Sequence, residues 1–227
     1  MKTMKNYKEY ILIPVLALFI SSVNAQTINW ASLNDGNKHI INANLGLEYG
    51  ITYGLGYGFQ IKTRLFPIVV NSEYSFPSGN EISDDFKTKI GGQIRWIEFH
   101  DFQFSTKIYG VFRRYENDFV RLLNFGSDVS GIVGYYRSKL FIAGEVGFDK
   151  AIVTNFRHSK KYNDQFSGVV DGWYEPATGG NFYYGLQAGF SFRKQDIYLR
   201  AGKILTQDFK TTPMVPIYGQ LGYNIKF

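Results

Sequence analysis

The sequence contains no cysteine, which excludes a disulfide framework and a lipoprotein anchor. Proline is also scarce, with six residues, whereas there are 24 glycines and aromatic residues make up 18% of the chain. This composition is typical of an all-β protein. After residue 25, no segment stays apolar for the roughly 18 residues that a membrane-spanning helix needs. Metal-ligand clusters, phosphate-binding loops and nucleotide motifs are missing from the sequence, so we expect no cofactor and no bound metal.

The first 25 residues have the pattern of an export signal. Three lysines within the first eight residues precede an apolar run at 11–20, which is too short to cross a bilayer. Val23 and Ala25 then satisfy the small-residue rule for cleavage. We therefore predict a signal peptide at residues 1–25 that is removed on export; the less favoured alternative is an N-terminal anchor helix.

The charge balance does not indicate a nucleic-acid partner. The formal net charge is +6, and the predicted signal peptide carries three lysines and one glutamate, a net +2, so +4 remains after cleavage. The remaining charge is spread along the chain, and a modest dispersed excess is a poor match for nucleic acid. We expect no nucleic-acid binding.

Residues 41–63 show the clearest pattern in the sequence. Odd positions carry apolar or aromatic side chains and even positions carry glycine or polar residues. A period of two predicts β-strand, and the length favours two strands joined by a hairpin. A three-residue loop at 50–52 would pair Tyr49 with Tyr53 and keep both arms in phase. One apolar face and one glycine-rich polar face suit a wall between lipid and a small wet lumen.

The same alternation recurs along the rest of the chain. The predicted strands cover about 39–49, 53–63, 68–76, 86–97, 102–113, 125–136, 140–149, 182–192, 197–205 and 214–227. Longer polar connections at 77–85, 114–124, 157–181 and 206–213 alternate with short turns, and only the loop at 50–52 departs from this pattern. Short turns on one side and long loops on the other are typical of outer-membrane barrels.

We therefore predict an all-β fold, a transmembrane antiparallel up-and-down β-barrel of about ten strands, with eight or twelve as alternatives. Residues 26–38 would form a periplasmic lead-in and residues 39–227 the barrel. A soluble sandwich or a lipocalin-like barrel is the competing interpretation, because their strands alternate in the same way.

The last predicted strand carries a further signal. Its apolar face ends with Tyr223, Ile225 and Phe227. This resembles the C-terminal signal of bacterial outer-membrane β-barrel proteins, and the resemblance implies recognition by the barrel-assembly machinery. The Tyr- and Gly-rich alternation at 53–58 and 218–223 also resembles small outer-membrane barrels of Bacteroidota. The resemblance implies residence in the outer-membrane lipid of a Gram-negative bacterium, and it implies topology rather than chemistry.

The inward face of the predicted strands collects charges of both signs. In a barrel of about ten strands, long side chains fill much of the interior, so we expect opposite charges to pair in a polar plug. The alternative is a narrow, porin-like channel for small anions, since cations outnumber acids. The residues of this lumen charge cluster are Glu48, Glu73, Lys87, Lys89, Arg95, Lys107, Arg113, Glu145 and Arg200, with Lys62, Asp149 and Lys226 on the same face.

A rim-located hydrolase is a further alternative. Omptin-type proteases resemble this chain in strand number, and their acidic residues and histidine would correspond to Asp84, Asp85 and His158, but the Asp-x-His spacing is missing. His158-Ser159 resembles the His-Ser pair of barrel lipid A deacylases, yet here the pair is predicted in a loop. We therefore predict no catalytic residues and no enzymatic activity.

The loop at 157–181 is the candidate contact surface. Exposed aromatic residues interleaved with cations suit lipopolysaccharide, a glycan or another envelope protein. The alternative is a loop folded back over the barrel mouth. We predict a structural or binding role through the external loops, with contact candidates Lys160, Lys161, Tyr162, Trp173 and Tyr174.

Overall fold

The computed structural model describes residues 26–33, 36–47, 50–78, 84–166, 168–177 and 179–227. The predicted signal peptide and Glu48 lie outside these residues. The described elements are η2 (Trp30–Ser32), β1 (His39–Leu47), β2 (Ile51–Lys62), β3 (Pro67–Pro77), β4 (Phe86–Phe99), β5 (Phe102–Glu116), β6 (Val120–Tyr136), β7 (Leu140–His158), α2 (Lys160–Asn163), β8 (Gly172–Tyr174), β9 (Gly180–Phe192), β10 (Gln195–Thr206) and β11 (Ile217–Lys226).

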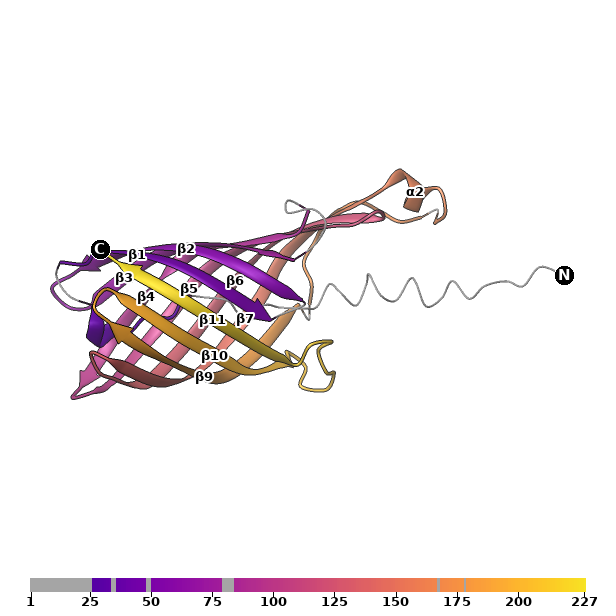
Figure 1. Ribbon diagram of the computed structural model, residues 1–227. Coiled ribbons are helices and arrows are strands. Elements are labelled where there is room, and N and C mark those ends of the chain that lie inside the picture. The colour runs from indigo at the N-terminus through magenta and orange to yellow at the C-terminus, as the bar shows by residue number, and fades with distance from the viewer. Residues whose placement is uncertain (1–25, 34–35, 48–49, 79–83, 167, 178) are drawn as a thin grey trace.

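Ten of these strands close into one antiparallel barrel (Figure 1). Each of these ten strands pairs with the one that follows it in the ring, so that β7 pairs with β9. The short β8 lies outside the ring and pairs with β7. Pairing of β1 with β11 joins the two ends of the chain, and pairing of β6 with β7 completes the ring. The predicted all-β, up-and-down barrel of ten strands is confirmed. None of the helices among the described residues has the length and apolar character that a bilayer-spanning helix requires.

Strand alternation separates an apolar outer face from a polar inner face. On the outside, Leu55 is 60% exposed and Ile90 is 62% exposed, whereas the inward Asn42 between outward neighbours is fully buried. The face assignments predicted for the strands at 39–49, 86–97 and 182–192 therefore agree with the structure. Because the side-chain period is two, this sorting depends only on the phase of each strand.

Glycines on the inner face make room for tyrosine rings of the neighbouring strand. Gly222 is the register partner of Tyr198, and a Cβ built on Gly222 would lie 2.1 Å from the tyrosine ring. Gly147 stands in the same relation to Tyr183, at 2.3 Å. A small residue thus stands beside a large one on neighbouring strands of the inner face, as in other small barrels whose interiors are filled by side chains.

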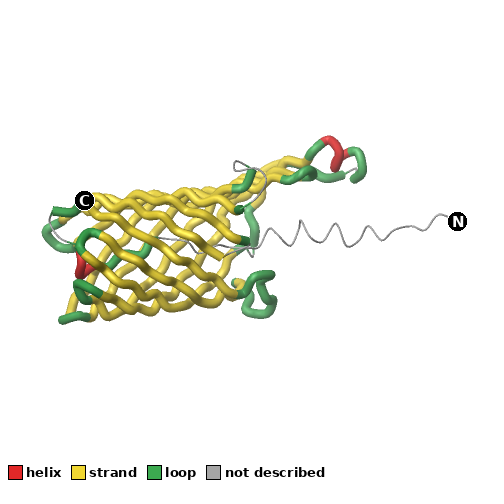
Figure 2. Tube along the Cα trace, in the orientation of Figure 1, coloured by secondary structure: helices red, strands yellow, loops and turns green. Residues whose placement is uncertain are grey.

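The two ends of the barrel differ (Figure 2). One end, called here the turn end, has the connections at 63–66, 100–101, 137–139 and 193–194 together with the C-terminus. His100 and Arg193 adopt positive φ of 55° and 56° in the two tightest of these turns. The opposite end has the connections at 78–85, 159–179 and 207–216. The connections at 48–50 and 117–119 on the same end are short. The predicted asymmetry is therefore present for three connections, whereas the long connection predicted at 114–124 is absent.

Two predicted connections are wrong in position. Leu47 pairs with Ile51, so the first hairpin turns two residues earlier than predicted, and the even shift leaves both faces unchanged. The loop predicted at 114–124 is largely strand, because β5 runs to Glu116 and β6 starts at Val120. These residues lack apolar alternation because they lie beyond the apolar outer band of the barrel.

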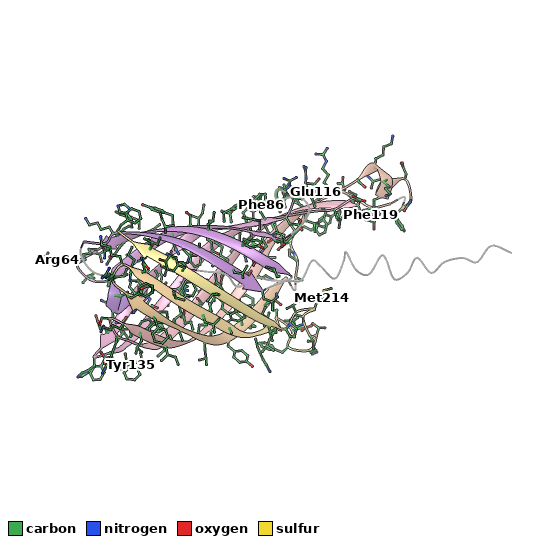
Figure 3. The ribbon with its side chains drawn as sticks, viewed as in Figure 1. Arg64, Phe86, Glu116, Phe119, Tyr135 and Met214 are labelled. Carbon is green, nitrogen blue, oxygen red and sulfur yellow. The ribbon has the colours of Figure 1, made fainter. Side chains whose placement is uncertain are left out.

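The extra length of β5, β6 and β7 forms a projection that we call the wing, made of 114–123 and 153–174. It carries α2 at its tip and extends past the other strands (Figure 1). Figure 3 shows Glu116 and Phe119 on the wing and Arg64 and Tyr135 at the turn end. We call the end that carries the wing the wing end. The strand predicted from 140 thus continues to His158, and the last strand starts at Ile217 rather than at 214.

Residues 26–30 of the segment predicted as a lead-in lie inside the barrel. Gln26, Thr27, Ile28, Asn29 and Trp30 are all buried. Asn29 caps the short η2 helix by accepting a hydrogen bond from the Ala31 amide. The side chains of Ile28 and Trp30 pack in a cluster with lumen residues near the turn end.

Candidate functional site: a cavity above a filled lumen

Buried ion pairs cross the lumen. The first joins Lys89 on β4 to Asp128 on β6, with Nζ 2.6 Å from Oδ2 and both side chains buried. Tyr183 on β9 donates from its hydroxyl to the other carboxylate oxygen of Asp128, at 2.7 Å. Each oxygen of Asp128 is therefore bonded by a different strand, which ties β4, β6 and β9 together across the interior.

The second pair joins Arg200 on β10 to Glu145 on β7. Tyr218 on β11 donates to Oε1 of Glu145 at 2.5 Å, and the Arg200 guanidinium lies 5.2 Å from the Tyr218 ring and 5.8 Å from the Tyr183 ring. Arginine above aromatic faces gains a cation–π contact in addition to its ion pair. Arg200 thus fills the lumen centre with bonded and packed atoms.

The third pair, Arg113 with Asp149, lies toward the wing end. At the turn end, Lys226 contacts Asp196 at 2.7 Å and donates to Ser32 Oγ at 2.6 Å. Buried charges of opposite sign therefore meet at several levels along the barrel axis. The cost of removing them from water is offset by this pairing and by the hydrogen bonds around it.

The N-terminal segment closes the turn end of the lumen. The Asn224 side chain donates to the Thr27 carbonyl at 2.8 Å, and Asn29 donates to Ser191 Oγ at 2.8 Å and to the Arg137 carbonyl at 2.9 Å. The Arg95 guanidinium lies 5.9 Å from the Trp30 ring. These contacts reach both the N-terminal and C-terminal halves of the barrel wall, so residues 26–30 occupy the lumen at this end.

The structure places the predicted lumen residues as follows. Glu73, Lys87 and Lys107 are buried on the inner face, and Nζ of Lys107 has no hydrogen-bond partner among the described residues. Arg95 pairs with Glu98 at 2.9 Å near the turn end, away from the central pairs.

Sequence reasoning missed several lumen residues. Asp128 lay in the predicted strand with the least regular alternation, and Asp196 was assigned to a turn. Tyr183 and Tyr218 alternate with the outward residues of their strands, so their inward positions could have been predicted. The residues missed are Asp128, Asp196, Tyr183, Tyr198 and Tyr218.

A cavity of about 400 Å³ opens at the wing end, above the Arg113–Asp149 pair. Its wall is the inner face of the wing, and the lining continues over Pro176, Gly179 and Asn181. The lining residues are Arg113, Tyr115, Leu122, Asn124, Ala151, Thr154, Phe156, His158, Val170, Tyr174, Pro176, Gly179 and Asn181.

The floor of the cavity is a chain of hydrogen bonds. Arg113 Nη1 donates to Asn124 Oδ1 at 2.9 Å, and Asn124 Nδ2 donates to Thr154 Oγ1 at 2.9 Å. The three residues stand side by side in the register of β5, β6 and β7. The ion pair with Asp149 fixes the other side of Arg113, so the floor is rigidly built.

His158 and Asp171 meet at the rim. Nδ1 of His158 lies 2.7 Å from Asp171 Oδ1, and the same oxygen accepts the His158 backbone N–H at 2.9 Å. These two hydrogen bonds hold the pKa of Asp171 below its usual range. The His158 ring stacks on Tyr162, with ring centroids 5.0 Å apart. The contacts anchor the chain at 171 to the end of β7.

The predicted contact residues occupy different parts of the wing. Lys160, Lys161 and Tyr162 belong to α2, and Lys161 Nζ lies 5.4 Å from the Phe119 ring. Tyr174 lines the cavity, whereas Trp173 is exposed and lies 6.0 Å from the Phe125 ring.

The acidic residues proposed for a rim hydrolase are not joined to the histidine in the described residues. Asp85 Oδ1 accepts the Glu116 backbone N–H at 2.9 Å, and burial raises the pKa of Asp85. Asp84 precedes it outside β4. His158 instead ends β7, with Ser159 as the N-cap of α2. Within the part of the chain that the structure describes, no three His, Asp or Glu residues gather as a metal site.

The predicted assembly signal lies at the seam of the barrel. Tyr223 and Ile225 pair with β1, and the Phe227 backbone exchanges two hydrogen bonds of 2.9 Å with His39. The Phe227 ring stacks on the His39 ring, with centroids 5.3 Å apart. The last residue therefore continues the β1–β11 pairing beyond the end of the strand.

No protein-family model matches the chain, and no curated protein matches it significantly. The solved structure of the KdgM porin in complex with disordered oligogalacturonate has a TM-score of 0.41 and 9% identity, over 83% of this chain and 99% of that chain. The outer-membrane enzyme PagL has a TM-score of 0.37 and 16% identity, over 83% of this chain and 99% of that chain. A mutant Rh. blastica porin has a TM-score of 0.21 and 7% identity, over 83% and 98%.

Identities and TM-scores this low do not allow the function of any of these proteins to be assigned to this chain. On its own strand pairing and its apolar outer face, the chain has the fold of an outer-membrane β-barrel.

Proposed function

We propose that this protein is an integral outer-membrane barrel with a closed lumen, which binds a ligand or partner at its wing end and catalyses no reaction. The filled lumen is the observation that carries the proposal. The Lys89–Asp128 and Glu145–Arg200 pairs occupy its middle, the Arg113–Asp149 pair lies toward its wing end, and residues 26–30 occupy its turn end. The hollow at the wing end remains as the place for a ligand.

The outer face supports the membrane location. Val146 is 60% exposed and Leu186 is 63% exposed, and similar apolar side chains surround the barrel. An exposed apolar band of this extent is unfavourable in water but suits the hydrocarbon of a bilayer. In this arrangement the barrel-assembly machinery inserts the chain, the turn end faces the periplasm, and the wing projects outside to meet lipopolysaccharide, a glycan or another envelope protein.

Conductance in planar bilayers tests the closed lumen. The purified protein should give little or no steady current, because paired side chains and the N-terminal segment occupy the lumen. A large, persistent, anion-selective current would instead favour the alternative, a narrow channel lined by Lys87 and Lys107, and the proposal would fail. Since these two residues are buried on the lumen face, their replacement should change the selectivity of such a current.

A rim hydrolase is the second candidate, favoured by the His158–Asp171 pair beside the cavity. A histidine oriented by a carboxylate can activate water or a hydroxyl. The assay is hydrolysis of p-nitrophenyl esters by the reconstituted protein and by His158→Ala. We expect no turnover that depends on His158; a clear loss of activity in the variant would identify an enzyme.

A further inference from the structure

We propose that the wing-end cavity binds a neutral amphiphile: a molecule with a short alkyl or aryl body and an uncharged head group that accepts hydrogen bonds. The inference rests on the proposed function and names the ligand class of the same site. It follows from how the strand register distributes polarity within the cavity, from the charge balance of the floor and from the cavity size.

The register sorts the wall into two rows. Arg113, Asn124, Thr154 and Tyr174 are successive partners on β5, β6, β7 and β8 and form the deep row. Two residues further out, the next inward-facing row is Tyr115, Leu122, Phe156 and Gly172. The deep row is rich in hydrogen-bonding groups, and the shallow row is mainly apolar.

Val170, Pro176 and Ala151 add apolar surface to the remaining walls. The other polar side chains of the lining are Asn181, which is the register partner of Asp149 and so lies at the level of the floor, and His158 at the rim. A ligand that fits both parts must carry a polar head group at the floor and an apolar body above it. A polar molecule, such as a sugar with hydroxyls on all sides, would leave hydroxyls without partners against Leu122 and Phe156.

The floor offers donors without a net charge. Nε of Arg113 is buried and has no hydrogen-bond partner among the described residues. Thr154 Oγ1 accepts from Asn124, so its own hydrogen is left to donate. Asp149 neutralises Arg113, and Lys87, the register partner of Arg113 on β4, lies outside the cavity lining. A carboxylate at the floor would therefore meet an arginine that already has its counter-ion, with the like charge of Asp149 beside it. A carbonyl, ester or hydroxyl oxygen can accept these hydrogen bonds without that repulsion.

The size suits a small ligand. A volume of about 400 Å³ lies within the usual range of small-molecule pockets. If each heavy atom takes about the 30 Å³ of a water molecule, the cavity holds about a dozen heavy atoms. A saturated alcohol or ester of about ten carbons meets this limit, whereas a whole glycolipid does not.

Photo-crosslinking in lipid nanodiscs tests the inference. The probes are a ten-carbon alcohol and the matching ten-carbon carboxylate, each with a diazirine in the chain, and labelled sites are mapped by peptide mass spectrometry. We expect the alcohol to label cavity residues of β6, β7 and the segment 168–177, severalfold more than the carboxylate does. Equal or stronger labelling by the carboxylate would overturn the assignment of a neutral head group.

Two variants examine the two ends of the ligand. Thr154→Val keeps the shape and removes the donor, and it should reduce labelling by the alcohol about two- to tenfold, as for the loss of one hydrogen bond. Leu122→Trp fills the apolar part and should abolish labelling of the cavity. Thr88→Val, a matched change on β4 outside the cavity lining, is the control and should have no effect.

All variants are first checked for heat-modifiable migration, so that misfolded protein is not scored. Labelling confined to lipid-facing residues such as Ile142 and Leu186, or labelling unaffected by Leu122→Trp, would overturn the inference. The outcome is separable from that of the proposed function, because a wrong ligand class leaves the bilayer current at zero, whereas an open channel conducts whatever the probes label.

Discussion

At the scale of single residues, Lys89 and Asp128 show how charges are kept inside the barrel. Neither side chain is exposed, and the pair is joined further to Tyr183. Removing one member of a buried pair leaves the other charged and unsatisfied, which costs more than the pair itself contributes. The interior charges are therefore mutually dependent, and a single neutralisation is a severe change.

Lys89→Met should lower the free energy of unfolding by about 3–5 kcal/mol, because Asp128 is left without its cation. Reversible urea unfolding in lipid vesicles, followed by tryptophan fluorescence, measures the effect. Lys139→Met, at an exposed turn position, is the matched control and should change stability by less than about 0.5 kcal/mol. Adding Asp128→Asn to Lys89→Met should recover part of the loss, and a neutral single variant would contradict the importance of the pair.

Which side chains face the lumen could be predicted, but their partners could not. Alternation alone puts Lys89, Arg113 and Glu145 on the inner face, because facing depends on a period of two. The pairing of Lys89 with Asp128 depends on the stagger of β4, β5 and β6 and on a register shift between Arg95 and Ile97 in the β4–β5 pairing. A bulge is not visible in a pattern of apolar residues, so the sequence offers no signal for this contact.

At the scale of elements, β9 provides a test of the membrane span. Leu186 points outward near the middle of the strand, and Phe192 points outward at its end, near the turn end. Leu186→Arg should cost about 2–4 kcal/mol, whereas Phe192→Arg should cost about 0–1 kcal/mol, since the penalty falls toward the membrane interface. Vesicle unfolding again gives the measurement. Equal costs at both positions would argue against a bilayer around this strand.

The connection between β7 and β9 should respond to acid. The pKa of Asp171 is lowered by its hydrogen bonds to His158, so the anchor is complete above the ordinary carboxyl value near 3.8. As the pH falls below that value and through the folded-state pKa, protonation removes the anchor and the segment 168–177 loosens. Hydrogen exchange of this segment should therefore rise at low pH, and Asp171→Asn should show the raised exchange at neutral pH already. An unchanged exchange rate in the variant would mean that the segment is held by other contacts.

The wing shows where element prediction from sequence ends. The ladder of β5, β6 and β7 continues to Glu116, Val120 and His158, although the residues beyond the apolar band are charged and aromatic on both faces. Backbone hydrogen bonds and local side-chain contacts, such as that of Phe156 with Tyr174, hold these strands, and neither shows as an apolar alternation in the sequence. Composition therefore predicted a loop at 114–124, and the cavity, which depends on the wing, could not be predicted either.

At the scale of the whole molecule, the barrel depends on joining its first and last strands. The seam between β1 and β11 runs from Leu47 paired with Gly219 to Ile40 paired with Lys226, and the His39–Phe227 hydrogen bonds extend it at the turn end. An unpaired edge within lipid would leave backbone groups unsatisfied, so closure of this seam completes the fold. The terminal residue thus has a structural position in addition to its resemblance to an assembly signal.

Deletion of Phe227 should lower the amount of folded, heat-modifiable protein in outer-membrane fractions, because it removes both the terminal aromatic ring and the last backbone pair of the seam. Phe227→Ala separates the two effects, since it keeps the backbone pair and removes the ring that stacks on His39. If the ring is what the assembly machinery requires, the alanine variant should fall as far as the deletion. If the backbone pair is what matters, the alanine variant should stay near the level of the unmodified protein. His39→Ala, which removes the stacking partner but leaves the terminal phenylalanine, is the control and should retain most of the folded yield. Unchanged yield and mobility after the deletion would contradict both roles and, with them, assembly into the outer membrane through the last strand.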